Sequence, residues 1–302
     1  MAEERSVTIR VPATTANLGP GFDCLGLALD LWNEVTFSLE GQTLNIQIQG
    51  EGEKDLPTDH TNLIVKAFLL VLNKYSITPP FGLAIRCRNC IPVSSGLGSS
   101  SSAVIAGLLA AKKLYSLDIQ DHRLLDIGLE LEGHADNMAA CLLGGLVIVV
   151  QDGNRLITRK LNIKPLQTTI ALPQIHLSTQ RAREVLPENL PLHEVVFNIG
   201  RTALLITSLV SGDYSTLSTA MQDRVHQPYR LGLIPSAENA IQAALNAGAL
   251  GAALSGAGPS VIAFHEGRNS EIGSEMKRTF EKEKAPVRIF ELTTSDAGAA
   301  IC

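Results

Sequence analysis

The chain has 302 residues and a formal net charge of −5 at pH 7, with 45% hydrophobic and 18% charged residues. This length suits two domains of ordinary size, and the composition excludes an intrinsically disordered chain. The negative net charge gives no reason to expect nucleic acid or an anionic membrane as a partner, because both favour clustered lysine and arginine.

The sequence further indicates a cytoplasmic protein. Its N-terminus, MAEERSVTIR, holds acids and a strand-like run, so no signal peptide is expected. No segment reaches the roughly 18 to 20 uninterrupted apolar residues that cross a bilayer. The five cysteines are odd in number and scattered, unlike those of a secreted disulfide scaffold. Cys87 and Cys90 form a C-x-x-C, but no second pair completes a zinc site, so we interpret them as small residues at a strand end.

The first half of the chain predicts strands that lead into loops. Residues 7–11 alternate and end at Pro12, which predicts a strand followed by the loop ATTANLGPGFD. A buried helix is predicted at 62–75 and a strand at 82–87. The loop at 92–102, PVSSGLGSSSS, precedes an alanine-rich helix with serine N-caps. A helix is predicted at 120–132 and precedes the short segment GHADNMAACLLGG. A buried strand at 146–150 and a turn at 152–153 are predicted after it.

The pattern of apolar residues and prolines changes past about residue 155. We therefore place a domain boundary there, which gives domains of residues 1–155 and 156–302. Short strands mixed with helices favour an α+β fold over a doubly wound sheet. The elements predicted in the second domain are strands at 168–172, 251–255, 260–264 and 287–292, and helices at 194–210, 236–247 and 270–284.

The loop at 92–102 carries the strongest chemical signal. Gly96 and Gly98 permit backbone conformations closed to other residues, so successive amide N–H groups can converge on an anion. The helix that begins near Ser99 adds the partial positive charge of its N-terminus. These features predict a phosphate-binding loop; the alternative is an N-capped helix after a flexible loop. Because the chain has no Gly-Lys-Ser/Thr, it is not a P-loop NTPase.

The same loop resembles the second signature of the GHMP kinases, P-x-x-x-G-L-G-S-S, a family named for galactokinase, homoserine kinase, mevalonate kinase and phosphomevalonate kinase. Two further segments, PATTANLGPGFD at 12–23 and LSGAGPS at 254–260, resemble the other family signatures in the expected order. The resemblance implies a two-lobed fold, with an N-terminal ribosomal-protein-S5-like lobe that carries ATP. A C-terminal ferredoxin-like lobe is expected to close the site.

Within the family, the first signature is similar to that of the homoserine kinases, since it lacks the basic residue found after the first strand of mevalonate and galactose kinases. EGHADN at 132–137 and the ending TTSDAGAAI are similar as well. The resemblance implies ATP-dependent phosphorylation of the L-homoserine side-chain hydroxyl, a step of threonine biosynthesis, by a homodimer. The alternatives are a GHMP kinase for mevalonate, a sugar or shikimate, and a catalytically silent sensor.

A zwitterionic amino acid needs a carboxylate clamp, an ammonium partner and groups around its hydroxyl. Arg183 and Arg230 lie where the resemblance places carboxylate-binding arginines. Asp23 is the candidate for the ammonium, and Asn17 and Asn137 for orienting the hydroxyl. Taken alone, such arginines are usually solvated and such Asn and Asp residues usually form turns. The other substrate contacts that we expect are His134, Asp136, Thr179 and Gly256.

The resemblance places ATP along the serine and glycine loop, at Pro92, Val93, Ser94, Ser95, Gly96, Leu97, Gly98, Ser99, Ser100, Ser101 and Ser102. Mg²⁺ accompanies ATP and prefers oxygen ligands while retaining water, so one carboxylate and one hydroxyl suffice from the protein. By resemblance these are Glu132 and Ser100. Glu130 is the alternative carboxylate, because the segment before the Asp-Asn pair is shorter here than in many members.

Phosphoryl transfer depends mainly on positioning and charge stabilisation. The first loop has no lysine to activate a nearby aspartate. We therefore hypothesise that the hydroxyl attacks the γ-phosphate directly, oriented by Asn17 and Asn137, without a dedicated base. The alternative is that Asp136 is the base.

Overall fold

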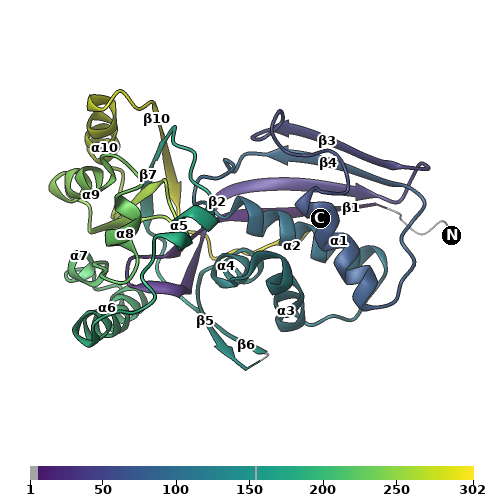
Figure 1. Cartoon of the computed structure of the whole chain (residues 1–302), viewed down its shortest axis with the longest axis horizontal. Coiled ribbons are helices and arrows are strands. Elements are labelled where there is room, and N and C mark those ends of the chain that lie inside the picture. Colours follow the sequence, from purple (N-terminus) through teal and green to yellow (C-terminus); the bar gives the residue numbers. More distant parts are fainter. Residues whose placement is uncertain (1–5, 154) are drawn as a thin grey trace.

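The computed structural model describes residues 6–153 and 155–302, which form two lobes, each with a sheet and helices (Figure 1). The sheet of the first lobe has the order β11-β1-β2-β4-β3, and β5 pairs with both β2 and β6. All of these pairs are antiparallel except β3 with β4. The strands are β1 (Ser6–Asn17), β2 (Gly21–Ser38), β3 (Leu44–Gly50), β4 (Leu83–Asn89), β5 (Leu146–Asp152), β6 (Arg155–Leu161) and β11 (Ala300–Ile301).

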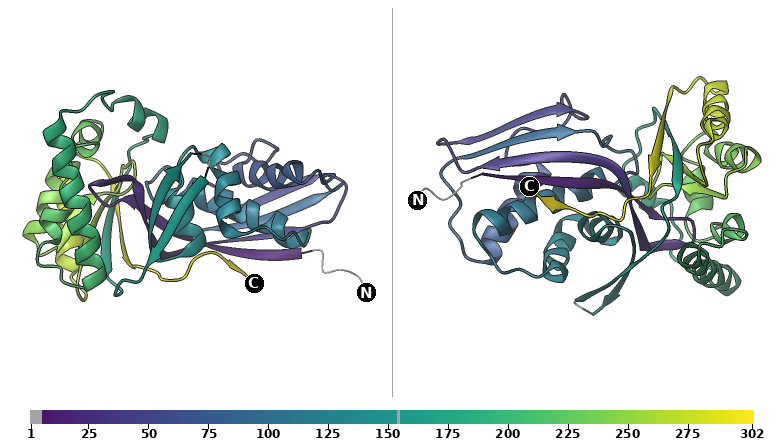
Figure 2. Two further views of the ribbon diagram at one scale, coloured as in Figure 1. Left: turned by 90° about the horizontal axis from the view of Figure 1, so that it is seen from below. Right: turned by 180° about the vertical axis from the view of Figure 1, so that it is seen from behind.

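Four helices cover one face of this sheet (Figures 1 and 2). They are α1 (Leu63–Lys74), α2 (Ser99–Leu114), α3 (Asp121–Glu132) and α4 (Asp136–Leu143). The apolar residues of α1 recur at helical spacing and are buried, and Phe68 stacks on Phe37 of β2 with ring centroids 5.9 Å apart. Asn62 caps α1 by accepting a hydrogen bond from the Ile64 amide at 2.9 Å. The periodicity therefore predicted this helix correctly.

The second lobe has an antiparallel sheet of order β10-β7-β9-β8 with helices on both faces. Its strands are β7 (Gln167–Pro173), β8 (Gly251–Leu254), β9 (Val261–His265) and β10 (Val287–Thr293). Its helices are α5 (Thr179–Glu184), α6 (Leu192–Ser211), α7 (Leu217–Ala220), α8 (Gln227–Leu231), α9 (Ala237–Asn246) and α10 (Ser270–Lys282). Helices α9 and α10 pack on one face, and α6 and α7 lie on the other.

The hairpin of β1 and β2 belongs to the cores of both lobes. Near the β1–β2 turn, Leu25 and Leu27 pack in one buried cluster with Leu205 of α6 and Ile262 of β9. Fully burying a leucine side chain contributes about 1.5–3 kcal/mol, so this cluster anchors the hairpin firmly in the second lobe. The hairpin turn therefore has a fixed place between the lobes.

Strand β1 does not end at Pro12, as the alternation predicted, but continues to Asn17. The register against β2 shifts between Pro12 and Ala13 and again between Ala16 and Asn17. Proline has no backbone N–H to donate, and a β-bulge is a position in a strand where this missing hydrogen bond is tolerated. The turn itself is short, and Asn17 and Leu18 both have positive φ. Most of the predicted loop is thus strand.

The predicted serine N-cap is wrong, and one helix beside the cavity was not predicted. Helix α2 begins at Ser99, but its N-cap is Gly98 with φ 71°, and no serine side chain caps it. The left-handed backbone of a glycine takes the capping position, which leaves the serine hydroxyls of the first turn for other contacts. Helix α4 forms within GHADNMAACLLGG, where no element was predicted, with Asp136 in its first turn.

The first sheet does not end at residue 155, where the domain boundary was placed. Strand β6 follows that position but pairs with β5 in the first sheet, and β11 returns from the C-terminal end to pair with β1 (Figure 2). The second sheet begins only at β7. Strand β6 forms a tight hairpin with β5, whereas β11 pairs with β1 at the other end of the chain. A change in local composition marks neither pairing.

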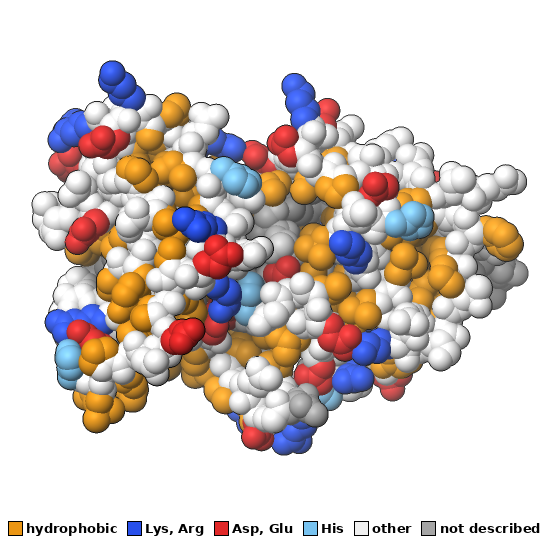
Figure 3. All heavy atoms as spheres, in the orientation of Figure 1, with side chains coloured by type: hydrophobic (Ala, Val, Ile, Leu, Met, Phe, Trp, Pro, Cys, Tyr) orange, Lys and Arg blue, Asp and Glu red, His pale blue; other side chains and the backbone are white. Residues whose placement is uncertain are grey.

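Helix α6 has two unlike faces. Its inner face contributes Leu205 and Leu209 to the core, whereas Leu192, Val196 and Ile199 are 77%, 59% and 64% exposed. Figure 3 shows hydrophobic side chains gathered over this helix at the lower left. By length and mean composition α6 could cross a membrane, the one such helix among the described residues, although polar residues such as Glu194 and Arg201 interrupt its apolar run. A single helix of this kind is weak support for a membrane span.

Gly107 sets how closely α2 approaches α1. A Cβ at this position would lie 2.4 Å from the Ile64 carbonyl oxygen and 2.8 Å from the Ala67 Cβ. We expect Gly107→Ala to lower the free energy of unfolding by about 1–3 kcal/mol, the usual cost of overpacking. Urea denaturation measures it.

Gly200 in α6 is the matched control, because nothing lies within 4 Å of its added Cβ. Gly200→Ala should raise the free energy of unfolding by up to about 1 kcal/mol through helix propensity alone. Equal effects of the two substitutions would show that the α1–α2 contact is not as tight as described.

Candidate active site

A cavity of about 460 Å³ lies between the two lobes, and both lobes line it. Figure 3 shows the surface hollowed there. The cavity gathers residues that the sequence places on separate segments. Its lining includes all of the residues predicted to contact substrate, namely Asn17, Asp23, His134, Asp136, Asn137, Thr179, Arg183, Arg230 and Gly256. The structure thus places these residues together, and their individual roles stay predictions.

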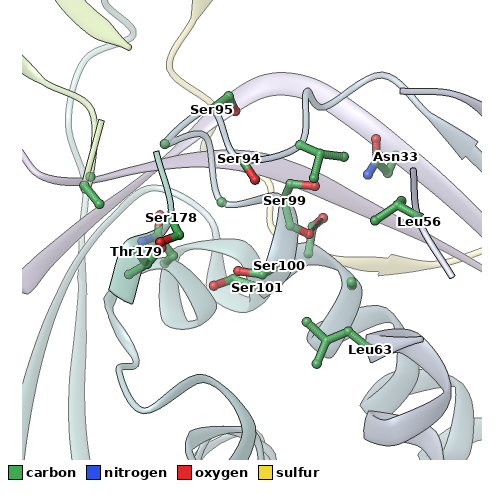
Figure 4. A pocket seen from close by; sticks show the side chains of 18 of the residues that line it. Asn33, Leu56, Leu63, Ser94, Ser95, Ser99, Ser100, Ser101, Ser178 and Thr179 are labelled. Atoms are coloured by element: carbon green, nitrogen blue, oxygen red, sulfur yellow. Dashed lines mark hydrogen bonds between the residues drawn. The ribbon is translucent and has the colours of Figure 1, made fainter. Parts of the chain in front are cut away.

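The serine and glycine loop forms one wall of the cavity. Gly98 has φ 71°, and a Cβ on it would lie 1.9 Å from the Thr14 Oγ1. A Cβ on Gly96, at φ 80°, would lie 2.3 Å from the Ser255 carbonyl oxygen. Both positions therefore need glycine for backbone conformation and for space. Figure 4 shows Ser99, Ser100 and Ser101 on the first turn of α2, at the edge of the cavity.

Most of the predicted ATP-binding residues line the cavity, but Pro92 and Leu97 do not. Leu97 is fully buried in the core between the lobes, so it supports the loop from behind. The Pro92 carbonyl accepts a hydrogen bond from the Ser95 hydroxyl at 2.7 Å, and the Ser95 Oγ accepts one from the Leu97 amide at 3.2 Å. These contacts fix the conformation of the loop.

Glu132 lies behind the first turn of α2. Its Oε2 accepts hydrogen bonds from the Ser100 and Ser101 hydroxyls at 3.0 and 2.7 Å. Glu130 instead forms an ion pair with Lys74 at 2.7 Å. Of the two glutamates, Glu132 therefore has the arrangement that fits Mg²⁺, a carboxylate beside hydroxyls. Across the described ranges 6–153 and 155–302, no group of three or more His, Cys, Asp or Glu residues forms a metal site, so phosphate and water oxygens would complete the coordination.

Asn17 and Asn137, the residues predicted to orient the hydroxyl, are held by hydrogen bonds. Asn17 donates through Nδ2 to the Gly256 carbonyl at 2.8 Å and accepts through Oδ1 from the Asp23 amide at 3.1 Å. Asn137 accepts through Oδ1 from the Thr14 hydroxyl at 2.8 Å. Sequence reasoning missed Thr14, although it lies inside the first signature. The contacts restrict both amides to one orientation.

His134 and Asp136 form a pair at the start of α4, with His134 Nδ1 3.2 Å from Asp136 Oδ1. Asp136 is only 3% exposed and also accepts a hydrogen bond from the Asn137 amide at 2.7 Å. Burial by itself lowers the pKa of His134, but the hydrogen bond to Asp136 and the charge of that carboxylate outweigh it, so the pKa is raised overall. The pair therefore favours a charged imidazolium.

The two arginines differ in their surroundings. Arg183 of α5 makes a bidentate pair with Asp23, with Nη1 to Oδ2 at 2.9 Å and Nη2 to Oδ1 at 2.7 Å. Arg230 of α8 is 1% exposed, and it donates through Nε to the Ala182 carbonyl at 3.0 Å. Burial, followed by the charge of Arg183, lowers the pKa of Arg230 to about 10. The candidate carboxylate clamp is thus a strongly desolvated cation beside a second one.

The far end of the cavity is apolar, and sequence reasoning missed it. Its lining includes Leu56, Leu63 and Ile64, with Asn33 and Asn62 among them. In Figure 4, Asn33, Leu56 and Leu63 lie on the far side of the serine loop from Ser178 and Thr179. The start of α1 supplies part of this wall, but nothing in its helical periodicity marks the residues as ligand contacts. An aromatic ring system suits such a pocket.

Comparisons with known proteins agree with this geometry. The family model for the GHMP kinases N terminal domain matches residues 62–145, and that for the GHMP kinases C terminal matches residues 205–282. A homoserine kinase of Moorella thermoacetica is 41% identical over 294 residues, covering 97% of this chain and 99% of its own. A homoserine kinase of Nostoc punctiforme is 37% identical over 302 residues, covering 99% of each chain.

Solved structures show the same relationship. The crystal structure of homoserine kinase from Cytophaga hutchinsonii has a TM-score of 0.88 and 32% identity, and the match covers 100% of this chain and 99% of that one. L. major mevalonate kinase, solved with R-mevalonate, has a TM-score of 0.71 at 18% identity, covering 99% and 97%, and shares the fold alone. The predicted α+β, two-lobed fold is confirmed.

The fold and the cavity together define a two-lobed kinase for small molecules. The chain belongs to the GHMP kinase family. Its relatives named above with more than 30% identity are homoserine kinases.

The pair of His134 and Asp136 predicts a pH-dependent contribution to stability. Because the folded-state pKa of His134 is raised, this contribution is fully present below the unfolded value of about 6.5 and is lost as pH rises through the raised pKa. Asp136→Asn should lower the pKa of His134, measured by NMR titration. The stability deficit of that variant should also be larger near pH 5.5 than near pH 8.5. An unchanged pKa would contradict the pairing.

Proposed function

We propose that this chain transfers the γ-phosphoryl group of ATP to the side-chain hydroxyl of L-homoserine, which gives O-phospho-L-homoserine and ADP, a step of threonine biosynthesis. The observation that carries the proposal is the presence of two unlike binding surfaces in one cavity. A glycine-flanked helix N-terminus suits phosphate, and Asp23 with Arg183 and Arg230 suits the two charged ends of an amino acid. The sequence relatives support the same substrate.

The ATP side of the cavity has room for each part of the nucleotide. The amide groups at the start of α2 and the serine hydroxyls suit the phosphates, and the apolar end beside Leu56 and Leu63 suits the base. Glu132 and Ser100 would hold Mg²⁺, which supplies charge stabilisation for the phosphates when it is bound. These assignments rest on the chemistry of the residues in place.

On the substrate side, Asp23 would bind the ammonium group, and Arg183 and Arg230 the carboxylate. The hydroxyl would then approach the phosphate loop beside Asn17 and Asn137, with His134, Asp136, Thr179 and Gly256 around it. Its oxygen forms the new bond to the γ-phosphorus as the bond to ADP breaks, and its proton passes to a phosphate oxygen or to water. Such a reaction needs positioning more than a strong base.

Asp136 remains the alternative base. Its Oδ1 already accepts hydrogen bonds from the Asn137 amide and faces His134, which favours a role in holding α4. Asp136→Asn separates the two roles. Loss of turnover with intact homoserine binding would identify Asp136 as the base. Weakened homoserine binding would instead show that Asp136 positions other residues.

Several coarser expectations belong to the same proposal. We expect a cytoplasmic homodimer that binds neither nucleic acid nor membrane. The negative net charge supports the absence of nucleic-acid binding. A sensor without activity is disfavoured because the two loop glycines, Ser100 and Glu132 are all in place.

Activity assays test the substrate directly. With Mg²⁺ and ATP, ADP release should be much faster with L-homoserine than with L-serine, L-threonine, mevalonate, galactose or shikimate. Arg230→Ala should raise the KM for homoserine by roughly 10- to 150-fold, because it removes hydrogen bonds to a charged group. Arg181→Ala is the control, since Arg181 is exposed on α5 and pairs with Glu184. Turnover of mevalonate or a sugar would overturn the substrate, and silence with bound ATP would indicate a sensor.

The metal assignment has its own matched pair of variants. Glu132→Gln should raise the Mg²⁺ concentration for half-maximal activity by roughly 10- to 100-fold, because the carboxylate charge is lost while the shape is kept. Glu130→Gln should leave it unchanged, since Glu130 pairs with Lys74. The opposite ranking in a Mg²⁺ titration would move the metal site to Glu130.

A further inference from the structure

His226 lies at the meeting point of the two lobes, and the proposed mechanism does not use it. It precedes α8 and is 0% exposed. Its Nε2 is 2.8 Å from the Gly19 carbonyl oxygen, and its Nδ1 is 3.2 Å from the Arg230 Nη1. The ring stacks on Phe22, with centroids 5.1 Å apart. One side chain thus touches both the β1–β2 turn and the buried arginine.

The two partners fix the tautomer of His226. A backbone carbonyl only accepts and a guanidinium only donates, so Nε2 must carry the proton and Nδ1 must present its lone pair. Asp223 Oδ2, 3.5 Å from Nε2, is also only an acceptor and agrees with this assignment. Burial lowers the pKa of His226 more than the charge of Asp223 raises it, and Arg230 lowers it further. The ring therefore stays neutral.

Asp223 fixes the position of the backbone that carries the ring. Its carboxylate accepts hydrogen bonds from the Asn198 side chain at 2.6 Å and from three successive amides. Those amides belong to Val225, His226 and Gln227, at 3.0, 2.9 and 2.6 Å. With this backbone anchored and the ring stacked on Phe22, the Nδ1 lone pair has a fixed direction.

The protein engages two of the three guanidinium nitrogens of Arg230. Nε donates to the Ala182 carbonyl and Nη1 to His226 and, at 3.3 Å, to the Gly256 carbonyl. Within the described parts of the chain, no hydrogen bond engages Nη2, and the side chain lines the cavity. The protein therefore holds Nε and Nη1 and leaves Nη2 to donate to a carboxylate.

We propose that His226 is a positioning residue: its Nδ1 holds Arg230 in the geometry that binds the substrate carboxylate, and its Nε2 ties that arginine to the turn leading to Asp23. This inference rests on the proposed function for the role of Arg230. It goes further by naming the group that sets the distance between the carboxylate and ammonium sites. Neutral imidazole is needed because a proton on Nδ1 would face the N–H groups of Arg230.

Two amide substitutions separate the two ring nitrogens. His226→Asn places a carbonyl oxygen near Nδ1, so it retains an acceptor for Arg230 and loses the donor to Gly19. His226→Gln places its amide near Nε2, so it retains that donor and loses the acceptor. We expect His226→Gln to raise the homoserine KM by roughly tenfold, the effect of losing one hydrogen bond to a charged group, with kcat and the KM for ATP little changed. His226→Asn should restore most of the loss.

A substrate without the carboxylate separates a role in carboxylate binding from a merely structural role, because a structural defect would lower activity with this substrate as well. With 3-aminopropan-1-ol, wild type and both variants should show the same low kcat/KM. The inference would be overturned if His226→Asn and His226→Gln lowered kcat/KM for homoserine equally, or if His226→Gln also lowered kcat/KM for the aminoalcohol. Either result would leave the substrate assignment intact. Inactivity of the wild-type protein with homoserine would instead overturn the proposed function, and this inference with it.

A second measurement does not depend on the folding of a variant. A long-range ¹H–¹⁵N spectrum of the wild-type protein should show His226 as the Nε2-protonated tautomer at neutral pH. The Nδ1-protonated tautomer, or a doubly protonated ring, cannot accept from Arg230 and would overturn the inference.

Discussion

The geometry of the site depends on the backbone carbonyl of Gly256. It accepts hydrogen bonds from Asn17 of β1 at 2.8 Å and from Arg230 of α8 at 3.3 Å, so one oxygen holds a residue from each lobe. The Gly256 amide donates in turn to the Ala16 carbonyl at 3.1 Å. Because all of these groups are buried, separating them would leave polar atoms without partners. The lobes are therefore joined through the substrate-facing residues themselves.

Local signals predicted most of the helices and the phosphate loop. Helix α1 follows from apolar spacing, and its predicted bounds differ from Leu63–Lys74 by one residue at each end. The requirement for glycine at Gly96 and Gly98 is also local, because it comes from positive φ and from the close approach of neighbouring atoms. Signature matches added the residues of the cavity wall. These parts need no knowledge of which distant segments meet.

The parts that sequence reasoning missed depend on non-local contacts. Strand β1 passes Pro12 because its pairing with β2 accommodates a bulge, and β11 joins the first sheet by pairing with β1 from the other end of the chain. Likewise, Asp223 and His226 look like ordinary turn and helix-end residues until the fold brings Gly19 against them. Single residues of this kind carry no pattern that spacing could reveal.

Asp23 and Arg183 neutralise each other across the cavity through a bidentate pair. A zwitterion that inserts between them exchanges one ion pair for two and leaves the total charge of the site unchanged. A ligand with only a carboxylate or only an ammonium group would instead leave Asp23 or Arg183 without a counter-charge in a partly desolvated place, which costs free energy. Selection against singly charged compounds is thus an electrostatic property of the protein alone, independent of how well such compounds fit the cavity.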